Sequence, residues 1–304
     1  MKQLQISKTI QKANKNYLAF GTFAVLIVLF YGNTLVSDGF AFDDIVQIEH
    51  NPYVQSLKYL PKTVMSCQWE YPNKGCMGRV LYYRPPFFVS SIVTYQISPN
   101  PWAFHLVSLL YFLVIVQLIY LITKAITKQL IPSLVAATLF LAHPIQTETV
   151  NWIAAGTELT LAVFALLAVL FYMRWRQSKS RKDLLFVYLW YFCAILSKEQ
   201  GILLPVLFLL ADLVLFRIPV KQLLRWSEVK NYFWFAVPFI LYMFMRISVI
   251  GFALGGGFTQ WTFSERVYVG VTLFTKYVSK IFYPYPLALF PPFEKSPDFL
   301  SLSF

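Results

Sequence analysis

Charged residues are scarce in this sequence. Asp, Glu, Lys and Arg make up 13% of its 304 residues, whereas 58% are hydrophobic and the mean hydropathy is +0.57. A soluble domain needs roughly 25% charged residues to cover its surface, so we expect lipid to cover most of this one. The shortage excludes a soluble enzyme and predicts an all-α polytopic membrane protein.

Acidic residues are the scarcer charge, with 14 Asp and Glu against 26 Lys and Arg and a net charge of +12. Such an excess would suit a nucleic-acid binder, but here the basic residues lie in short loops between apolar runs, as in membrane proteins. We therefore expect membrane lipids, and no nucleic acid, as partners. The first apolar run, 17–30, is followed by no small-residue cleavage site, which predicts a signal anchor.

Cysteine is rare too, with three residues in the chain. Cys67 and Cys76 flank a polar segment, and they would form a disulfide in an oxidising compartment or stay free thiols in a reducing one. Cys193 lies in an apolar run. The sequence leaves the state of the pair open.

Eight apolar segments are candidate spans, because a spanning helix needs about 20 residues and somewhat fewer where the bilayer adjusts. They cover residues 17–35, 102–123, 128–142, 157–173, 184–197, 202–216, 231–250 and 265–283. The N-terminus and the loops 124–129, 174–183 and 217–230 hold 15 of the 26 basic residues. Alternation places these four segments on one side, which the positive-inside rule makes the cytoplasm.

The other loops then share the outer face, and the first outer loop, 36–101, is the largest. Its apolar stretch 87–97 is too short for a span, so we predict a helix in the outer interface. No repeat of 20–50 residues is evident, and we expect 1–304 to form a single membrane domain. A large polar loop is not needed for stability in a membrane protein, which makes 36–84 a candidate for function.

Two polar motifs lie in this loop. Asp43 and Asp44 are adjacent carboxylates that repel each other, so one of them could have a raised pKa and act as a base. Asp44 could equally be a helix N-cap. Arg84 precedes two prolines and could hold a phosphate through its bidentate guanidinium, or could simply snorkel at a helix start.

Three further motifs lie at the outer ends of later spans. His143-Pro144 and the nearby Glu148 form a poor metal signature and suit a polar network that shapes a cavity, so no metal is predicted and a divalent ion is the alternative. Lys198-Glu199-Gln200 is either a plain charged hairpin or a paired functional group. Arg246, near the end of an apolar helix, is an intramembrane cation and so a functional hypothesis.

The predicted topology brings all these motifs to one face and one depth. Carboxylates beside several cations suit a substrate with a phosphate head and a lipid tail, since the cations can stabilise the charge of a departing phosphate. A carboxylate would deprotonate an acceptor hydroxyl.

The order of the motifs resembles the membrane domain of the tetratricopeptide-repeat O-mannosyltransferases that target cadherins, and of their bacterial relatives. The resemblance covers about residues 17–295 and is most specific at His143-Pro144 and at Lys198-Glu199-Gln200-Gly201. It implies a GT-C glycosyltransferase that moves a sugar, mannose among the candidates, from a polyprenyl- or dolichyl-phosphate donor by an inverting displacement. The residues it singles out are Asp43 or Asp44 for catalysis, Arg84, Lys198 and Arg246 for the donor phosphate, and His143, Glu148, Glu199 and Gln200 as support for the cavity.

Three features depart from that pattern. No tetratricopeptide repeats are present in these residues, and Gln146 stands where the family has a second His. From the missing repeats we expect a truncated version or a separate lineage, in a bacterial inner membrane with a periplasmic active face, with the endoplasmic reticulum as the alternative. Pro85-Pro86 is closer to protein O-mannosyltransferases and aminoarabinose transferases, so the donor sugar stays open, as does the acceptor (protein, lipid or glycan).

Two other functions compete with this one. Intramembrane charges also serve transporters or flippases of lipid-linked or anionic solutes, although these often show two related halves. A non-catalytic assembly subunit would keep the fold and tolerate loss of Asp43 and Asp44.

Overall fold

A computed structural model describes residues 2–71, 75–76, 82–251, 262–285 and 287, and of residues 2–15 the helical backbone alone. Helices dominate these ranges, which confirms the all-α membrane class. The longer helices are α1 (Lys2–Tyr31), α2 (Pro85–Ile97), α3 (Pro101–Thr127), α4 (Leu130–Ala142), α6 (Gly156–Ser178), α7 (Arg181–Ser197), α8 (Leu204–Val214), α11 (Ala236–Ile250) and α12 (Phe263–Phe282).

Short elements join them. These are the helices α5 (Gln146–Asn151), α9 (Val220–Leu223) and α10 (Trp226–Phe233), the turns η1 (Gly32–Val36), η2 (Ile45–Glu49), η3 (Leu57–Met65), η4 (Ile153–Ala155) and η5 (Glu199–Leu203), and the strands β1 (Glu70–Tyr71) and β2 (Gly75–Cys76). The two strands pair antiparallel, with Glu70 opposite Cys76.

Four segments of the described chain are long and apolar enough to cross a bilayer unaided: Asn16–Val36, Pro101–Thr127, Ile153–Ser178 and Trp226–Ile250. Helix α4 is apolar but has 13 residues, fewer than the roughly 20 that a spanning helix needs. The predicted total of eight spans therefore stays a prediction.

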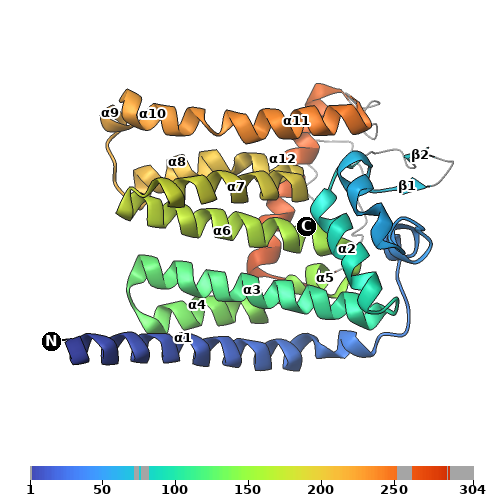
Figure 1. Ribbon diagram of the computed structural model, residues 1–304, viewed down its shortest axis with the longest axis horizontal. Coiled ribbons are helices and arrows are strands. Elements are labelled where there is room, and N and C mark those ends of the chain that lie inside the picture. Colours follow the sequence, from blue (N-terminus) through green and yellow to red (C-terminus); the bar gives the residue numbers. More distant parts are fainter. Residues whose placement is uncertain (1, 72–74, 77–81, 252–261, 286, 288–304) are drawn as a thin grey trace.

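The long helices stack side by side in Figure 1, from α1 at one edge to α10 and α11 at the other. The N-terminus and the α3–α4, α6–α7 and α8–α9 connections lie together at one end of this bundle. That end carries the four basic segments, as the charge pattern predicted. Helix α12, predicted as the span 265–283, instead runs across the others in this view. Its four charged residues, Glu265, Arg266, Lys276 and Lys280, lower its hydropathy.

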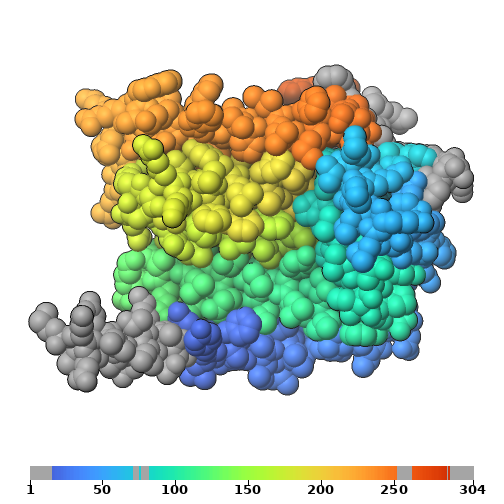
Figure 2. All heavy atoms as spheres, in the orientation of Figure 1, coloured from blue at the N-terminus to red at the C-terminus, as the bar shows by residue number. Residues whose placement is uncertain are grey.

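The first outer loop covers the opposite end of the bundle, where Figure 2 shows it in blue to cyan. Within it, α2 begins at Pro85 and Pro86, which suit the first turn of a helix because proline has no N–H to leave unpaired. A small core of its own lies beneath, formed by Ile48, Val54, Phe88, Ile92 and Phe104 among others. The described part of this loop is therefore packed into the domain rather than being a loose connection.

Gly201 shows how closely the outer ends pack. A Cβ placed on it would lie 2.8 Å from the backbone carbon of Ala194 and from the backbone nitrogen of Ile195. A side chain there would push η5 off the end of α7. Glycine at this position thus fixes the turn that carries Lys198 and Glu199.

Candidate active site

A cavity of about 1170 Å³ lies at the end of the bundle opposite the basic segments, between the first outer loop, the α5–η4 region and the α7–η5 turn. Most of the residues singled out in the sequence line it: Asp43, Arg84, Glu148, Lys198, Glu199 and Gln200. These side chains come from segments more than 150 residues apart, and the fold brings them together around one cavity.

The two adjacent aspartates have different surroundings. Asp43 lines the cavity, and partial burial raises the pKa of its carboxyl. Asp44 is 2% exposed, and its Oδ1 accepts a hydrogen bond from the backbone N–H of Ala154 at 2.7 Å. Burial raises the pKa of Asp44 to about 6, against the lowering effect of hydrogen bonds from Ala154 and Ala41. Asp44 ties the loop to η4, and Asp43 is the carboxylate that can meet a substrate.

The backbone just before this pair is strained. Phe42 has a φ of 50°, in the left-handed region that residues other than glycine seldom adopt. Its exposed side chain lines a second cavity of about 330 Å³, whose wall shares Glu148 and Trp152 with the larger one. Such strain persists where the surroundings over-determine it and tends to mark functional sites. Here the buried Asp44 supplies the anchor.

Two cations face the larger cavity, and each already has a carboxylate partner. Lys198 forms an ion pair with Glu158, and the Nη2 of Arg84 lies 3.2 Å from Oε2 of Glu199. Burial and the nearby charge of Arg84 lower the pKa of Lys198 to about 8. The Nε of Arg84 is buried and has no hydrogen-bond partner within the described residues.

Glu148 adds a third acidic side chain from α5. Partial burial raises the pKa of its carboxyl, and the charge of Lys198 counters that rise. Together with Asp43 and the two paired glutamates, it makes the described part of the cavity richer in carboxylates than in cations.

Besides Asp44, two predicted site residues, His143 and Arg246, are not among those that line the cavity. The ring of His143 holds a turn, because its Nδ1 accepts from the backbone N–H of Ile145 at 3.2 Å and its Nε2 lies 2.9 Å from the carbonyl oxygen of Ile281. Arg246 lies near Tyr242, and its charge acts on the hydroxyl of that tyrosine together with the charges of Arg84 and Glu199.

The sequence reasoning missed several lining residues. Glu158 was visible as a carboxylate near the start of a span, but nothing local tied it to Lys198. Gln47, Gln68, Trp69 and Tyr82 also line the cavity. Gln68 and Trp69 directly follow Cys67, so the cysteine pair was the one signal that could have drawn attention to them.

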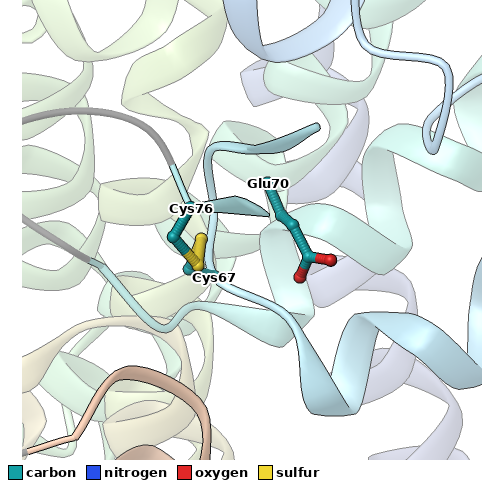
Figure 3. A group of neighbouring side chains, drawn as sticks. All are labelled: Cys67, Glu70 and Cys76. Atoms are coloured by element: carbon teal, nitrogen blue, oxygen red, sulfur yellow. A yellow bond between two sulfur atoms is a disulfide. The ribbon is translucent and has the colours of Figure 1, made fainter. Parts of the chain in front are cut away.

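Cys67 and Cys76 form a disulfide (Figure 3). Their sulfurs and the carboxylate of Glu70 lie within 4.8 Å of one another, as in some metal sites. However, Glu70 points away from the bonded sulfurs in Figure 3 and pairs with Lys62 at 2.6 Å. Metals bind thiolates, and sulfurs joined to each other are no longer thiolates, so we assign this group a structural role.

The chain was then compared with known proteins. The model of the family described as dolichyl-phosphate-mannose-protein mannosyltransferase matches residues 85–247, more than half of the chain. That match includes Glu148 and the Lys198 turn, and it begins beyond Asp43 and Asp44. No solved structure matches the chain significantly.

Among curated proteins, the chain is similar to the protein O-mannosyl-transferase Tmtc2 of Drosophila melanogaster, with 31% identity over 56% of this chain and 18% of that protein. Human TMTC2 is 28% identical over 64% of this chain and 24% of its own length, and human TMTC3 is 28% identical over 53% and 18%. The alignments thus span about a fifth of each of these relatives. By the family match, this multi-pass membrane chain belongs to the dolichyl-phosphate-mannose-protein mannosyltransferase family, with a membrane domain that resembles those of the TMTC O-mannosyltransferases.

Proposed function

We propose that this protein transfers a sugar from a polyprenyl- or dolichyl-phosphate donor to a hydroxyl of an acceptor. The observation that carries the proposal is one cavity in which the carboxylate of Asp43 faces the same space as the cations Arg84 and Lys198. Family membership supports a glycosyltransferase, and the names of the relatives favour mannose as the sugar and protein as the acceptor.

In the proposed reaction, Asp43 takes the proton of the acceptor hydroxyl as its oxygen attacks the anomeric carbon. The bond between that carbon and the phosphate oxygen breaks, and the lipid phosphate leaves with the electron pair. A single displacement of this kind inverts the configuration at the anomeric carbon. Proton, sugar and leaving group are then all accounted for without a further reactant.

Arg84 and Lys198 would hold the departing phosphate. Since each is already paired with a glutamate, the phosphate must take over part of the guanidinium from Glu199 or of the ammonium from Glu158. Phosphate competes well for arginine because the planar guanidinium gives two parallel hydrogen bonds. Stabilising the developing charge in this way needs no metal ion. If EDTA abolished transfer and Mn²⁺ or Mg²⁺ restored it, this metal-free mechanism would be wrong.

We place the cavity on the outer side of the membrane. The four basic segments lie at the opposite end of the bundle, which the positive-inside rule assigns to the cytoplasm. The Cys67–Cys76 disulfide lies at the cavity end, and disulfides persist in oxidising compartments such as the periplasm or the lumen of the endoplasmic reticulum.

The test uses the purified chain in detergent or liposomes with a radiolabelled polyprenyl-phosphate mannose. We expect release of the sugar to an acceptor peptide or to water by the wild type, and loss of release in the Asp43→Asn variant. Turnover that is absent across a panel of lipid-linked donors, in protein shown to be folded, would overturn the proposal. Coupled uptake of a lipid-linked solute without sugar transfer would then favour a transporter.

A further inference from the structure

The Cys67–Cys76 disulfide lies beside the larger cavity. Cys67 is 1% exposed and belongs to a hydrophobic cluster that includes Tyr83, whereas Cys76 is half-buried at the edge of that cluster. Gln68 and Trp69, the two residues after Cys67, line the cavity. The covalent bond therefore closes a short segment that contributes two residues to the cavity lining.

The two strands of the hairpin in this segment are too short to be stable by themselves. Strands β1 and β2 have two residues each, and a two-stranded hairpin is marginally stable at best in water. The ion pair between Lys62 and Glu70 is partly exposed, and such pairs contribute little to stability. The disulfide restricts the segment more strongly, because it keeps the two ends together in every conformation of the chain.

A series of contacts connects this segment to Arg84. The backbone N–H of Gln68 donates to the carbonyl of Tyr82 at 2.8 Å, and the rings of Trp69 and Tyr82 meet edge to face with centres 5.9 Å apart. The guanidinium carbon of Arg84 lies 4.2 Å from the centre of the same Tyr82 ring, a distance at which a cation is attracted to an aromatic ring. The segment thus helps to set the position of Tyr82, and Tyr82 that of the guanidinium.

The contact with Tyr82 matters most when Arg84 changes partner. In the structure its Nη2 lies 3.2 Å from Oε2 of Glu199, and in the proposed reaction the donor phosphate takes over part of the guanidinium. The ring of Tyr82 is a contact that Arg84 keeps during this exchange. A guanidinium that is fixed in advance loses less entropy when the phosphate binds.

We propose that Cys67 and Cys76 are positioning residues for Arg84, and that tight binding of the donor phosphate requires their disulfide. This inference rests on the proposed function and adds a redox requirement to it. When a dithiol reduces the pair, the disulfide takes up two electrons and two protons and becomes two thiols, and the dithiol closes to its own disulfide. Tyr82 then loses part of its support, and Arg84 its fixed position. The chain thus reaches its full affinity for the donor only in an oxidising compartment.

The experiment measures the affinity of the purified chain in detergent for polyprenyl phosphate, before and after reduction with dithiothreitol. We expect reduction to weaken binding about 10-fold, the value of one good interaction with a charged group, and reoxidation with oxidised glutathione to restore it. Cys76→Ser should reproduce the weakening without a reductant, and Tyr82→Leu should reproduce it with the disulfide intact. A count of free thiols verifies the state of the pair, and thermal unfolding verifies that each sample is folded.

Two variant backgrounds separate an effect on Arg84 from a general loosening of the cavity. Arg84→Gln binds more weakly but keeps Lys198 and the contacts with the lipid, and reduction should change its affinity less than about 2-fold, because the group that the disulfide positions is gone. Reduction of Lys198→Gln should still weaken binding about 10-fold, since Arg84 is present. Cys193→Ser removes the free cysteine and should respond to reduction as the wild type does.

Two results would overturn the inference: no weakening of binding on complete reduction of the wild type, or equal weakening in the Arg84→Gln and Lys198→Gln backgrounds. The second result would make the disulfide a purely structural bond. In both cases the oxidised chain still binds the lipid phosphate, so the proposed function survives. If the oxidised wild type bound no polyprenyl phosphate and released no sugar from the mannosyl lipid, the proposed function itself would fail, and the redox requirement with it.

Discussion

Two clusters of charged residues lie at opposite ends of this bundle, and they differ in whether their charged groups are open to a ligand. At the basic end, Arg176 contacts both Asp212 and Glu228, and its side chain is 1% exposed. The hydroxyl of Tyr232 also donates to Asp212, at 2.7 Å. At the opposite end, Arg84 and Lys198 have glutamate partners but face a large cavity.

The difference shows how to separate structural from functional ion pairs. A buried pair with every lone pair satisfied is closed to ligands, and breaking it costs stability. A pair that is partly open, beside unpartnered donors and a carboxylate with a raised pKa, can exchange its partner for a substrate. The following predictions test this distinction, from the largest expected effect to the smallest.

Asp43→Asn should lower the rate of sugar transfer by roughly 10²- to 10⁴-fold, because it removes the general base. The melting temperature should stay close to that of the wild type, since Asp44, and not Asp43, ties the loop to η4. Asp38→Asn, an exposed carboxylate of the same loop, is the matched control and should leave the rate unchanged. Equal rates in the two variants would contradict the assignment.

Arg176→Ala should destabilise the folded protein by about 3–5 kcal/mol, because it leaves the carboxylate of Asp212 buried without its cation. Thermal unfolding in detergent measures the loss. Arg174→Ala removes a pair whose arginine side chain is 58% exposed, with Asp183 at 3.5 Å, and should cost less than about 1 kcal/mol. Donor affinity of the protein that remains folded should be unaffected in both.

Binding of the lipid phosphate should weaken about 10-fold as the pH rises from 7 to 9. Lys198 has a pKa lowered to about 8 by burial and by Arg84, so it is largely charged at pH 7 and largely neutral at pH 9. Lys198→Arg keeps its charge over this range, and its binding should be nearly independent of pH. A wild-type profile as flat as that of the arginine variant would remove Lys198 from the phosphate site.

Asp44 should make the folded state less stable at pH 7 than at pH 5, by about 1 kcal/mol. Its pKa is raised to about 6 in the folded protein, so the folded state binds a proton more tightly than the unfolded chain does. Stability from this group therefore falls as the pH rises toward 6 and above. Asp44→Asn should lose this part of the pH dependence, which unfolding curves at the two pH values would show.

Much of the architecture could be read from the sequence because hydropathy is a local property. Pro101–Thr127 is apolar enough to predict a span by itself, and the diproline Pro85-Pro86 predicts the start of α2. The cavity was also foreseeable in part, since polar motifs at the outer ends of spans must lie at a similar depth. Helix α12, which was predicted as a span, is not among the described segments apolar enough to cross a bilayer unaided, because its four charged residues lower its hydropathy.

The details of the site could not be read in this way. Nothing near Arg84 in the chain points to Glu199, which lies 115 residues further on. Neither does any local pattern separate Asp43 from Asp44, because the separation depends on the backbone N–H of Ala154, 110 residues away from Asp44.

The sequence by itself determined that this chain is a helical membrane protein, which segments are apolar, and which kinds of chemical group stand at their ends. These follow from composition and from short-range order along the chain. Tertiary structure alone decided which aspartate faces the cavity, which carboxylate holds each cation, and that Gln68 and Trp69 share a wall with Tyr82. Such choices depend on contacts between distant segments, and these contacts are set by how closely the helices pack, as at Gly201 against Ala194.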